Sequence, residues 1–224
     1  MNPDIPIYYS ILLILLVFVI LIAIAQGVNY GLSRLGFQAG KKSKIATVTS
    51  LAIFTWLIVT ETLAFSGYFK DYTSNPPHVV ILYILPIIFI IYLLQNKKFE
   101  RLLMEIPPSW LINAQSIRVI IELIFWGLFV NNIISKRMTF LGSNYDILIG
   151  LFAPFISYYC FQRKLSKYYA IIFNVLGLLF HLTIVSVAFY SIPGEARLFY
   201  PGPANTLYGY FPFIWLPAFI TPFI

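Results

Sequence analysis

Charged residues are scarce in this 224-residue chain: they make up 10% of it, while 60% of the residues are hydrophobic. A soluble domain carries about 25% charged and about 45–50% apolar residues. The deficit of charge excludes a soluble enzyme, a disordered chain and a secreted disulfide scaffold, and it predicts a multi-pass membrane protein. The net charge of +7 would suggest nucleic acid as a partner for a soluble protein. Here the basic residues lie in short loops between apolar runs, so we expect no nucleic acid partner.

Residues that bind metals or carry out covalent catalysis are also few. The single cysteine, Cys160, excludes an intrachain disulfide, and with only His78 and His181 beside it the chain lacks the ligands of the usual zinc sites. The sequence has no phosphate-binding glycine loop and no H-E-x-x-H motif. It also has no aspartate pair suited to intramembrane proteolysis, no convincing serine–histidine arrangement, and no lysine in the last apolar segment for a retinal Schiff base. We therefore expect no cofactor and no metal, and a lipid-modifying enzyme is the weakest functional hypothesis.

Seven apolar segments are long enough, or nearly long enough, to cross a hydrocarbon core about 30 Å thick as helices. They cover approximately residues 7–32, 45–66, 79–95, 111–134, 147–162, 168–191 and 209–224. These runs are too long for barrel strands, and a helix is the other way to satisfy backbone polar groups in lipid. The sequence therefore predicts one all-α domain, residues 1–224, built as a bundle of about seven transmembrane helices.

Basic residues are distributed unevenly among the loops. Ten of them lie on one side of the predicted membrane: Arg34, Lys41, Lys42, Lys44, Lys97, Lys98, Arg101, Arg163, Lys164 and Lys167. Four lie on the other side: Lys70, Lys136, Arg137 and Arg197. Because cytoplasmic loops carry the excess of Lys and Arg, we predict an outer N-terminus and an inner C-terminus. The first six residues include Asp4 and no basic residue, so we expect the first segment to be a retained helix, not a signal peptide.

Two of the seven segments are short and contain proline. Residues 147–162 include Pro154, and residues 209–224 include Pro212, Pro217 and Pro222. At 1.5 Å per residue each rises about 24 Å, which is less than the hydrocarbon thickness. Such segments are either the broken helices of a transporter binding site or ordinary membrane helices that tolerate proline.

Polar side chains inside membrane segments are costly, so each is a candidate functional residue. Gln115, Arg118 and Glu122 share one helix face in the segment 111–134, because they lie three and four residues apart. Arg118 and Glu122 can neutralise each other. They form either an internal pair that pins this helix to its neighbours or a polar track for protons, ions or an anionic ligand.

Two further membrane segments carry isolated polar residues. Asn174 and His181 share a face of the segment 168–191, and His181 lies at about the depth of Glu122. His181 either makes a hydrogen bond between helices or relays protons with Glu122. Glu61 lies near the outer end of the segment 45–66, where it either reaches the interface or lines an outer vestibule.

The predicted outer loops hold a second set of candidates, which either are simply exposed to water or together form a binding mouth. These residues are Asp71, His78, Asn144, Asp146, Arg197 and Asn205. A third set, Ala23, Gly27 and Gly31, repeats at a spacing of four in the first segment. Small residues at this spacing let helices approach closely, either within the chain or to a partner.

Three stretches of the sequence are distinctive in combination. The first comprises residues 107–111, 114–118 and 122–123, the second residues 138–140, 142, 144, 146–148, 150–151 and 153–154, and the third residues 203–206 and 211–217. This combination resembles a family of uncharacterised bacterial polytopic inner-membrane proteins. The resemblance implies a multi-pass protein of the bacterial inner membrane, and it implies no activity.

Two main functional hypotheses are compatible with the sequence. The first is a seven-helix protein that binds or moves a small polar solute or ion, with Glu122, Arg118 and His181 in its interior. The second is a non-catalytic subunit of a larger membrane complex, or a homo-oligomer, packed through the small-residue face of the first helix. The lipid bilayer is a partner in both cases. A lone particle with a water-filled cavity would favour the first hypothesis, and stable co-purification with other chains would favour the second.

Overall fold

A computed structural model describes residues 5–195 and 197–224, which form helices and loops with no strand among them. Four helical stretches are long and apolar enough to cross a membrane: Ile7–Arg34, Ala39–Phe65, Pro108–Val130 and Lys167–Phe189. A fifth candidate is the bent pair His78–Leu94 and Lys97–Glu105. The described residues are therefore all-α, as predicted, and these helices support a membrane protein, with four or five candidate spans where the sequence predicted about seven. Asp4, which entered the prediction of a retained first helix, lies outside the described residues.

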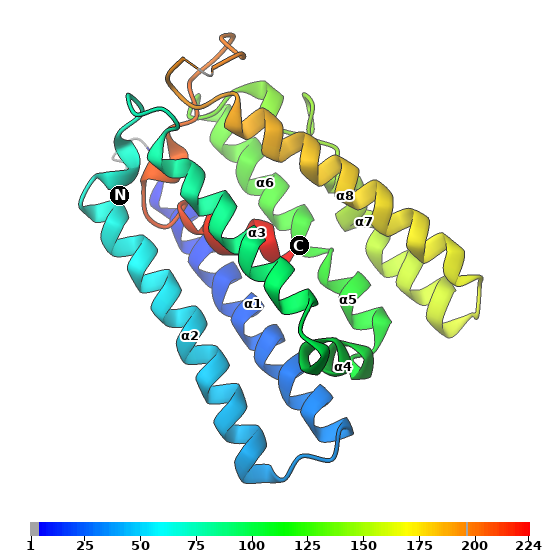
Figure 1. Cartoon of the computed structure of the whole chain (residues 1–224). Coiled ribbons are helices and arrows are strands. Elements are labelled where there is room, and N and C mark those ends of the chain that lie inside the picture. Colours follow the sequence, from blue (N-terminus) through cyan, green and yellow to red (C-terminus); the bar gives the residue numbers. More distant parts are fainter. Residues whose placement is uncertain (1–4, 196) are drawn as a thin grey trace. The chain divides into compact units, whose positions relative to one another are not determined.

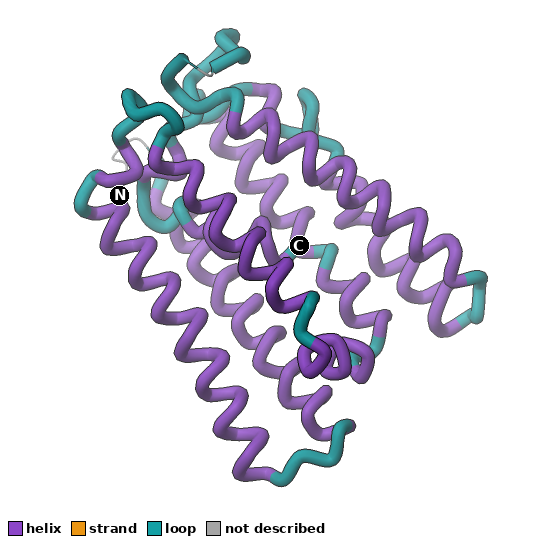
Figure 2. The backbone as a smooth tube through the Cα atoms, in the orientation of Figure 1, coloured by secondary structure: helices purple, strands orange, loops and turns teal. Residues whose placement is uncertain are grey.

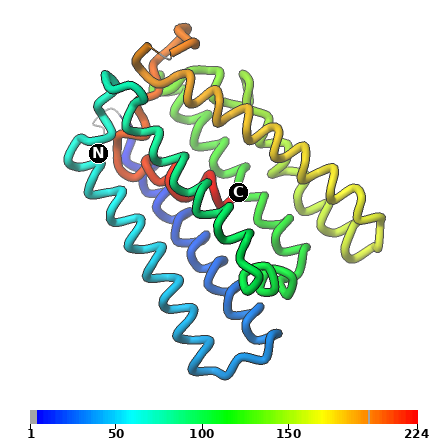
Figure 3. Tube along the Cα trace, viewed as in Figure 1, coloured from blue at the N-terminus to red at the C-terminus, as the bar shows by residue number. Residues whose placement is uncertain are grey.

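The chain divides into two compact units. The first unit comprises residues Ser10–Pro107 and Tyr208–Phe223, and the second comprises residues 5–9, Pro108–Leu207 and Ile224. Figures 1 and 3 trace the path of the chain from the blue N-terminal helix to the red C-terminal segment, which returns to the first unit.

The first unit begins with two long helices, α1 (Ile7–Arg34) and α2 (Ala39–Phe65). They run side by side in opposite directions, as the blue and cyan ribbons of Figure 1 show. The chain reverses between them in a short loop in which Gly36 has a φ of 76°. This left-handed conformation strains any residue with a Cβ, so glycine favours the tight reversal.

A sharp bend separates α3 (Ile81–Leu94) from α4 (Lys97–Glu105), whose axes differ by 84° when α3 is taken with the preceding short helix His78–Val80. Asn96 lies between the two helices, and its side chain caps the start of α4. Its Oδ1 atom accepts hydrogen bonds from the backbone N–H groups of Lys98 and Phe99. Phe99, Leu102 and Leu103 lie on one face of α4 and are half-buried, while its charged residues lie on the other faces.

The C-terminal segment of the first unit is not one continuous α-helix. Short helical pieces follow one another: Leu207–Gly209, a π-helix at Leu216–Ile220, and α9 (Thr221–Phe223). Pro212, Pro217 and Pro222 each lack the backbone N–H that a regular helix needs, which explains why the predicted helix over 209–224 is broken. The pieces pack on α2 and α3, and two tryptophans tie them to α2: Trp56 Nε1 donates to the Ala218 carbonyl at 2.9 Å and Trp215 Nε1 to the Leu57 carbonyl at 3.3 Å.

Helices of the second unit are α5 (Pro108–Ala114), α6 (Ile117–Val130), α7 (Asp146–Ser157) and α8 (Lys167–Phe189). A π-helix, Tyr158–Gln162, extends α7. The core of this unit consists of buried side chains from α5, α7, the π-helix and α8: Ile112, Ile149, Ala153, Cys160, Ala170 and Phe173. A short helix, Lys136–Met138, lies in the loop between α6 and α7.

The predicted helix over 111–134 is interrupted near its start. Residues Gln115 and Ser116 form a turn between α5 and α6, visible as a break in the purple helix in Figure 2. There the backbone N–H groups of Arg118 and Val119 bond to carbonyls three residues earlier, those of Gln115 and Ser116. Such tight turns inside a helix often mark functional hinges, and this one lies directly beside Arg118.

Candidate functional site

Two glycines bring α6, α7 and α8 close together in the second unit. A Cβ atom on Gly150 of α7 would lie 2.8 Å from the backbone nitrogen of Val119 in α6, closer than real Cβ atoms come. A Cβ on Gly177 of α8 would lie 3.4 Å from the Ile149 side chain. The absence of side chains at these positions lets polar groups of three helices meet at one place.

A buried ion pair lies at the centre of this meeting point. Arg118 Nη1 in α6 donates a hydrogen bond to Asp146 Oδ1, at the start of α7, over 2.7 Å. The second carboxylate oxygen, Oδ2, lies 3.0 Å from His181 Nδ1 in α8. Arg118 and Asp146 are each only 3% exposed. One carboxylate therefore links charged and titratable groups from three helices.

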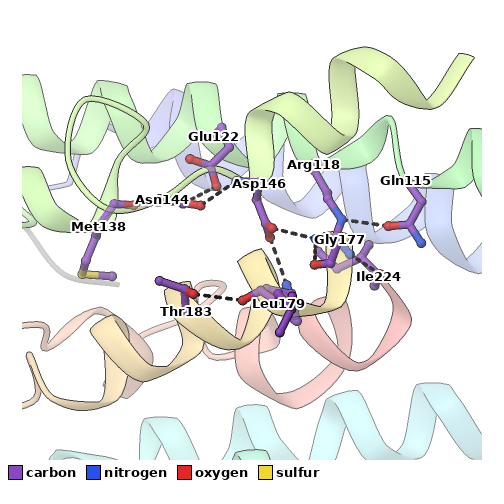
Figure 4. A network of polar contacts seen from close by, with 11 residues as sticks. Gln115, Arg118, Glu122, Met138, Asn144, Asp146, Gly177, Leu179, Thr183 and Ile224 are labelled. Carbon is purple, nitrogen blue, oxygen red and sulfur yellow. Dashed lines mark hydrogen bonds and ion pairs between the residues drawn. The ribbon is translucent and has the colours of Figure 1, made fainter. Parts of the chain in front are cut away.

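The guanidinium group of Arg118 has further acceptors on several sides. Its Nε atom donates to Gln115 Oε1 at 2.8 Å, and Nη1 also donates to the Gly177 carbonyl of α8 at 3.2 Å. Nη2 donates to the main-chain oxygen of Ile224 at 2.6 Å. Figure 4 shows these bonds radiating from Arg118. Guanidinium groups have five N–H donors in a fixed geometry, so this network fixes the position of the charge.

Glu122 belongs to a second, adjoining set of bonds. It is 2% exposed, and its Oε1 atom accepts a hydrogen bond from Asn144 Nδ2. Asn144 also donates to the Met138 carbonyl at 3.1 Å, and its Oδ1 atom accepts from the backbone N–H of Asp146 at 3.1 Å. Asn144 therefore joins Glu122 to the first residue of α7, as Figure 4 shows.

Two buried atoms of these side chains have no hydrogen-bond partner among the described residues: His181 Nε2 and Glu122 Oε2. Buried polar atoms are nearly always hydrogen-bonded, so unpaired ones call for an explanation. When the Nδ1 proton of His181 points to Asp146, the Nε2 lone pair is free to accept a proton or a hydrogen bond. The site therefore presents an unpaired ring nitrogen and an unpaired carboxyl oxygen beside the Arg118–Asp146 ion pair.

The structure gives these residues partners that sequence spacing did not indicate. From the spacing of four residues we expected Arg118 to pair with Glu122. In the structure Arg118 forms its hydrogen-bonded ion pair with Asp146, 28 residues later. His181 was expected either to make a hydrogen bond between helices or to relay protons with Glu122, and its ring contacts Asp146 of α7. Asn174, expected to share the interior face with His181, is exposed.

The predicted outer-loop residues of the second unit do not behave as one group. Asn144 and Asp146 were expected in a wet mouth, yet they are 0% and 3% exposed and belong to the buried network. Asn205 is also buried, and its Nδ2 donates to the Ala188 carbonyl at 3.1 Å, which ties its loop to the end of α8. Arg197 donates to the carbonyls of Phe199 and Gly202, which follow it in its own loop, so its contacts hold that part of the loop together.

The other two outer-loop residues, Asp71 and His78, lie in the first unit. Asp71 Oδ1 accepts hydrogen bonds from the hydroxyl and the backbone N–H of Thr73, and these bonds hold the pKa of the Asp71 carboxyl below its usual value. The His78 ring stacks on Tyr68 with centroids 4.3 Å apart, and its Nδ1 lies 3.1 Å from the Tyr68 carbonyl oxygen. These contacts order the loop between α2 and α3.

The remaining predicted residues also lie in the first unit. Both carboxylate oxygens of Glu61 in α2 are buried and have no hydrogen-bond partner within the described residues. Gly27 and Gly31 of α1 are covered by the same chain: a Cβ on Gly31 would lie 2.7 Å from Leu102, and one on Gly27 would lie 3.5 Å from Ile106. The small-residue face is thus an internal contact with the α4 region at these two positions, whereas Ala23 is exposed.

Sequence reasoning missed the roles of Gly150 and Gly177 and the central place of Asp146. A usable signal was present, because Asp146, Gly150, Ala153 and Ser157 recur at spacings of three and four and form one small or polar helix face. All four are buried. The predicted segment 147–162 was defined by an apolar run that starts after Asp146. For this reason we expected the aspartate to lie in a loop.

The network contains donors, acceptors and titratable groups, but it is not a metal centre of the usual kind. No group of three His, Cys, Asp or Glu side chains among residues 5–195 and 197–224 could hold a metal ion. Comparisons of the chain with protein-family models, with curated proteins and with solved structures find no match.

Proposed function

We propose that the chain is a multi-pass protein of a bacterial inner membrane that binds or moves a small polar solute or ion. The Arg118–Asp146–His181 network with Glu122 would form the polar part of its pathway. The observation that carries the proposal is the pair of buried atoms without partners, His181 Nε2 and Glu122 Oε2, beside a compensated ion pair. Burial of ionisable groups in a membrane helix costs about 2.5–3.5 kcal/mol each near its centre, a cost that a purely structural helix contact does not require.

Proton exchange is the chemistry that these residues support best. Asp146 orients the His181 ring through Nδ1, which directs Nε2 away from the carboxylate. An imidazole ring can donate or accept a proton at either nitrogen, and the unpaired Nε2 of His181 would be the exchanging atom. The turn at Gln115–Ser116 supplies an irregular segment next to the network, and irregular helices are typical of transporter sites.

The proposal includes the topology predicted from the basic residues. Residues 79–95, 147–162 and 209–224 would complete seven crossings, with the N-terminus outside and the C-terminus inside. In a variant with Cys160→Ser, a cysteine replacing Lys136 should react with a membrane-impermeant maleimide in intact cells, and a cysteine replacing Lys42 should not. The opposite pattern of labelling would reverse the orientation.

A proton-flux measurement tests the proposed activity. The full chain is reconstituted into vesicles that contain a pH-sensitive dye, and a potassium diffusion potential is applied. The wild-type protein should increase the rate of internal pH change, and His181→Leu and Glu122→Gln should each reduce this increase about a hundredfold, the lower end of a proton-transfer contribution. His78→Leu, at the only other histidine, is the matched control and should keep the wild-type rate. Equal rates in protein-containing and protein-free vesicles would refute proton exchange by this site.

The alternative, a non-catalytic subunit, loses part of its support. It depended on a free face of small residues on α1, and Leu102 and Ile106 of the same chain cover Gly31 and Gly27 on that face. Purification still separates the two hypotheses, since a subunit should co-purify with other membrane chains in fixed stoichiometry.

A further inference from the structure

A groove of about 570 Å³ lies between α1 and α2 in the first unit. This volume is within the range of small-molecule sites, about 300–1,000 Å³. Its polar lining comes from Gln26 and Asn29 of α1 and from Lys42, Ser43 and Thr47 of α2. No acidic residue lines it. The groove shares no residue with the polar network of α6–α8.

The groove lies where the two helices leave the apolar part of their sequence. In α1, uninterrupted apolar residues extend from Ile11 to Ala25, and Gln26 and Asn29 follow. α1 has 28 residues and therefore rises about 42 Å, some 12 Å more than a hydrocarbon core of about 30 Å. Polar side chains enter α1 at this end, with Gln26, Asn29 and Ser33, so we place the groove at the depth of lipid headgroups.

The polar lining has the chemistry of a phosphate site. Lys42 donates one of its three N–H bonds to Ser33 Oγ at 2.8 Å, which fixes its ammonium group at the groove and leaves two donors for a ligand. The amides of Gln26 and Asn29 and the hydroxyl of Ser43 are exposed and can donate further hydrogen bonds. A positive charge surrounded by neutral donors favours an anion with several acceptor oxygens.

The rest of the lining is apolar and requires a ligand with a tail. Ile22 and Ala25 of α1 and Ala39 and Ala46 of α2 form this part. Ile22 is the lining residue of α1 that lies furthest towards the apolar part of the helix. A molecule that fits the whole groove therefore has an anionic head at Lys42 and a hydrocarbon chain directed along Ile22.

The surrounding charges favour the same kind of ligand. Lys41 and Lys44 flank Lys42 and are exposed, and Arg34 ends the neighbouring helix. Arg34 lies 3.8 Å from Glu105 of α4, with more than half of its side chain exposed. Clusters of basic residues beside a membrane helix attract anionic lipids, at about 1 kcal/mol for each Lys or Arg.

We propose that the α1–α2 groove binds an anionic phospholipid, with the lipid phosphate at Lys42, Gln26 and Asn29 and one acyl chain against Ile22, Ala25 and Ala46. The site takes its ligand from the membrane leaflet that faces the α1–α2 loop. This proposal does not depend on transport by the α6–α8 network.

The test measures lipid binding to the full-length purified protein in neutral detergent, using dioleoylphosphatidylglycerol and, for comparison, dioleoylphosphatidylcholine. Lys42→Gln should weaken binding of phosphatidylglycerol about fivefold, the effect of one charge near the surface. Ala46→Phe, which fills the groove and keeps every charge, should weaken it at least as much. Lys167→Gln removes an exposed lysine at the start of α8 and is the matched control, with no more than about a twofold effect. Native mass spectrometry of each variant reports both the bound lipid and the intact fold.

Three outcomes would overturn the proposal. Equal weakening by Lys42→Gln and Lys167→Gln would show binding by overall charge and not by this groove. Full binding by Ala46→Phe would show that the lipid lies elsewhere. Displacement of the lipid by inorganic phosphate at millimolar concentration would identify a free-phosphate site. Because none of these measurements involves proton flux, failure here leaves the proposed function of the second unit untouched, and the reverse also holds.

Discussion

The two units differ in the ionisable side chains that they bury. In the first unit most of them lie at helix ends and in loops, as Arg34 and Lys41 do. In the second unit Arg118, Glu122 and Asp146 are buried in the interior and no more than 3% exposed. The cost of burying charges in a membrane helix therefore depends less on their number than on the partners that the fold gives them. Glu61 and Glu122 make this clear, since each lies in a long apolar helix but only Glu122 has a hydrogen-bond partner within the described residues.

The largest expected effect comes from removing the shared partner of the second unit. Asp146→Leu leaves the Arg118 charge buried without its counter-ion, and breaking a buried pair in this way costs about 3–5 kcal/mol. The free energy of unfolding, measured by titration with sodium dodecyl sulfate in mixed micelles, should fall by that amount.

A double change separates pairing from simple loss of polarity. Arg118→Leu combined with Asp146→Leu should be less destabilising than Asp146→Leu alone, because no unpaired charge remains. Asp71→Asn is the control for a carboxylate in a loop and should change the free energy of unfolding very little. A double variant less stable than Asp146→Leu would mean that the ion pair itself is not the stabilising feature.

A second comparison concerns close helix contacts in the two units. Gly150→Ala places a Cβ atom 2.8 Å from the rigid Val119 backbone, and such overpacking costs about 1–3 kcal/mol. Gly27→Ala meets only the end of the Ile106 side chain at 3.5 Å, so its effect should stay within about 0.5 kcal/mol. The same unfolding titration measures both, and equal effects would contradict the tighter packing of the second unit.

An intermediate effect is expected at His181. His181→Leu removes its contact with Asp146, while Arg118 still compensates the carboxylate. Loss of one hydrogen bond to a charged group corresponds to about 1.5–3 kcal/mol, and the leucine side chain recovers part of this by packing. We therefore expect a smaller loss of unfolding free energy than for Asp146→Leu. A loss of equal size would make histidine, and not arginine, the main partner of the aspartate.

The smallest effect, and the one of opposite sign, is expected in the first unit. Glu61→Leu breaks no hydrogen bond among the described residues and removes the cost of burying a polar group. The free energy of unfolding should stay the same or rise by up to about 1 kcal/mol. Glu122→Leu, by contrast, should lower it, because Asn144 loses its acceptor. A destabilising Glu61→Leu would show that both glutamates are held by the fold, and the comparison between the units would fail.

Local patterns in the sequence predicted the helices better than they predicted the contacts. Runs of apolar residues identified α1, α2 and α8 closely. Helix formation and the length of an apolar run both depend on residues that are neighbours in the sequence. The polar residues Gln115, Arg118, Glu122 and His181 were identified for the same reason. Their partners were not, since a spacing of four residues indicates only local neighbours, whereas Asp146 reaches Arg118 through the packing of α6 on α7.

The irregular helices were predicted in part. Proline marked the segments around Pro154 and Pro217 as unusual, and π-helices occur in or after both. The turn at Gln115–Ser116 contains no proline or glycine. Nothing in the intrinsic preferences of these residues indicates a break there, and the Arg118 side chain lies at that point with acceptors outside its own helix.

The bend between α3 and α4 bears on how the protein responds to bilayer thickness. The stretch His78–Leu94 rises about 25 Å, some 5 Å less than an average hydrocarbon core. α4 then turns by 84° and presents charged residues immediately after it. In the proposed topology this crossing could not lengthen by one more helical turn, so lipid beside α3 would have to compress, and each ångström of mismatch costs a fraction of a kcal/mol. Membranes with shorter acyl chains should accommodate this crossing with less deformation than thick ones.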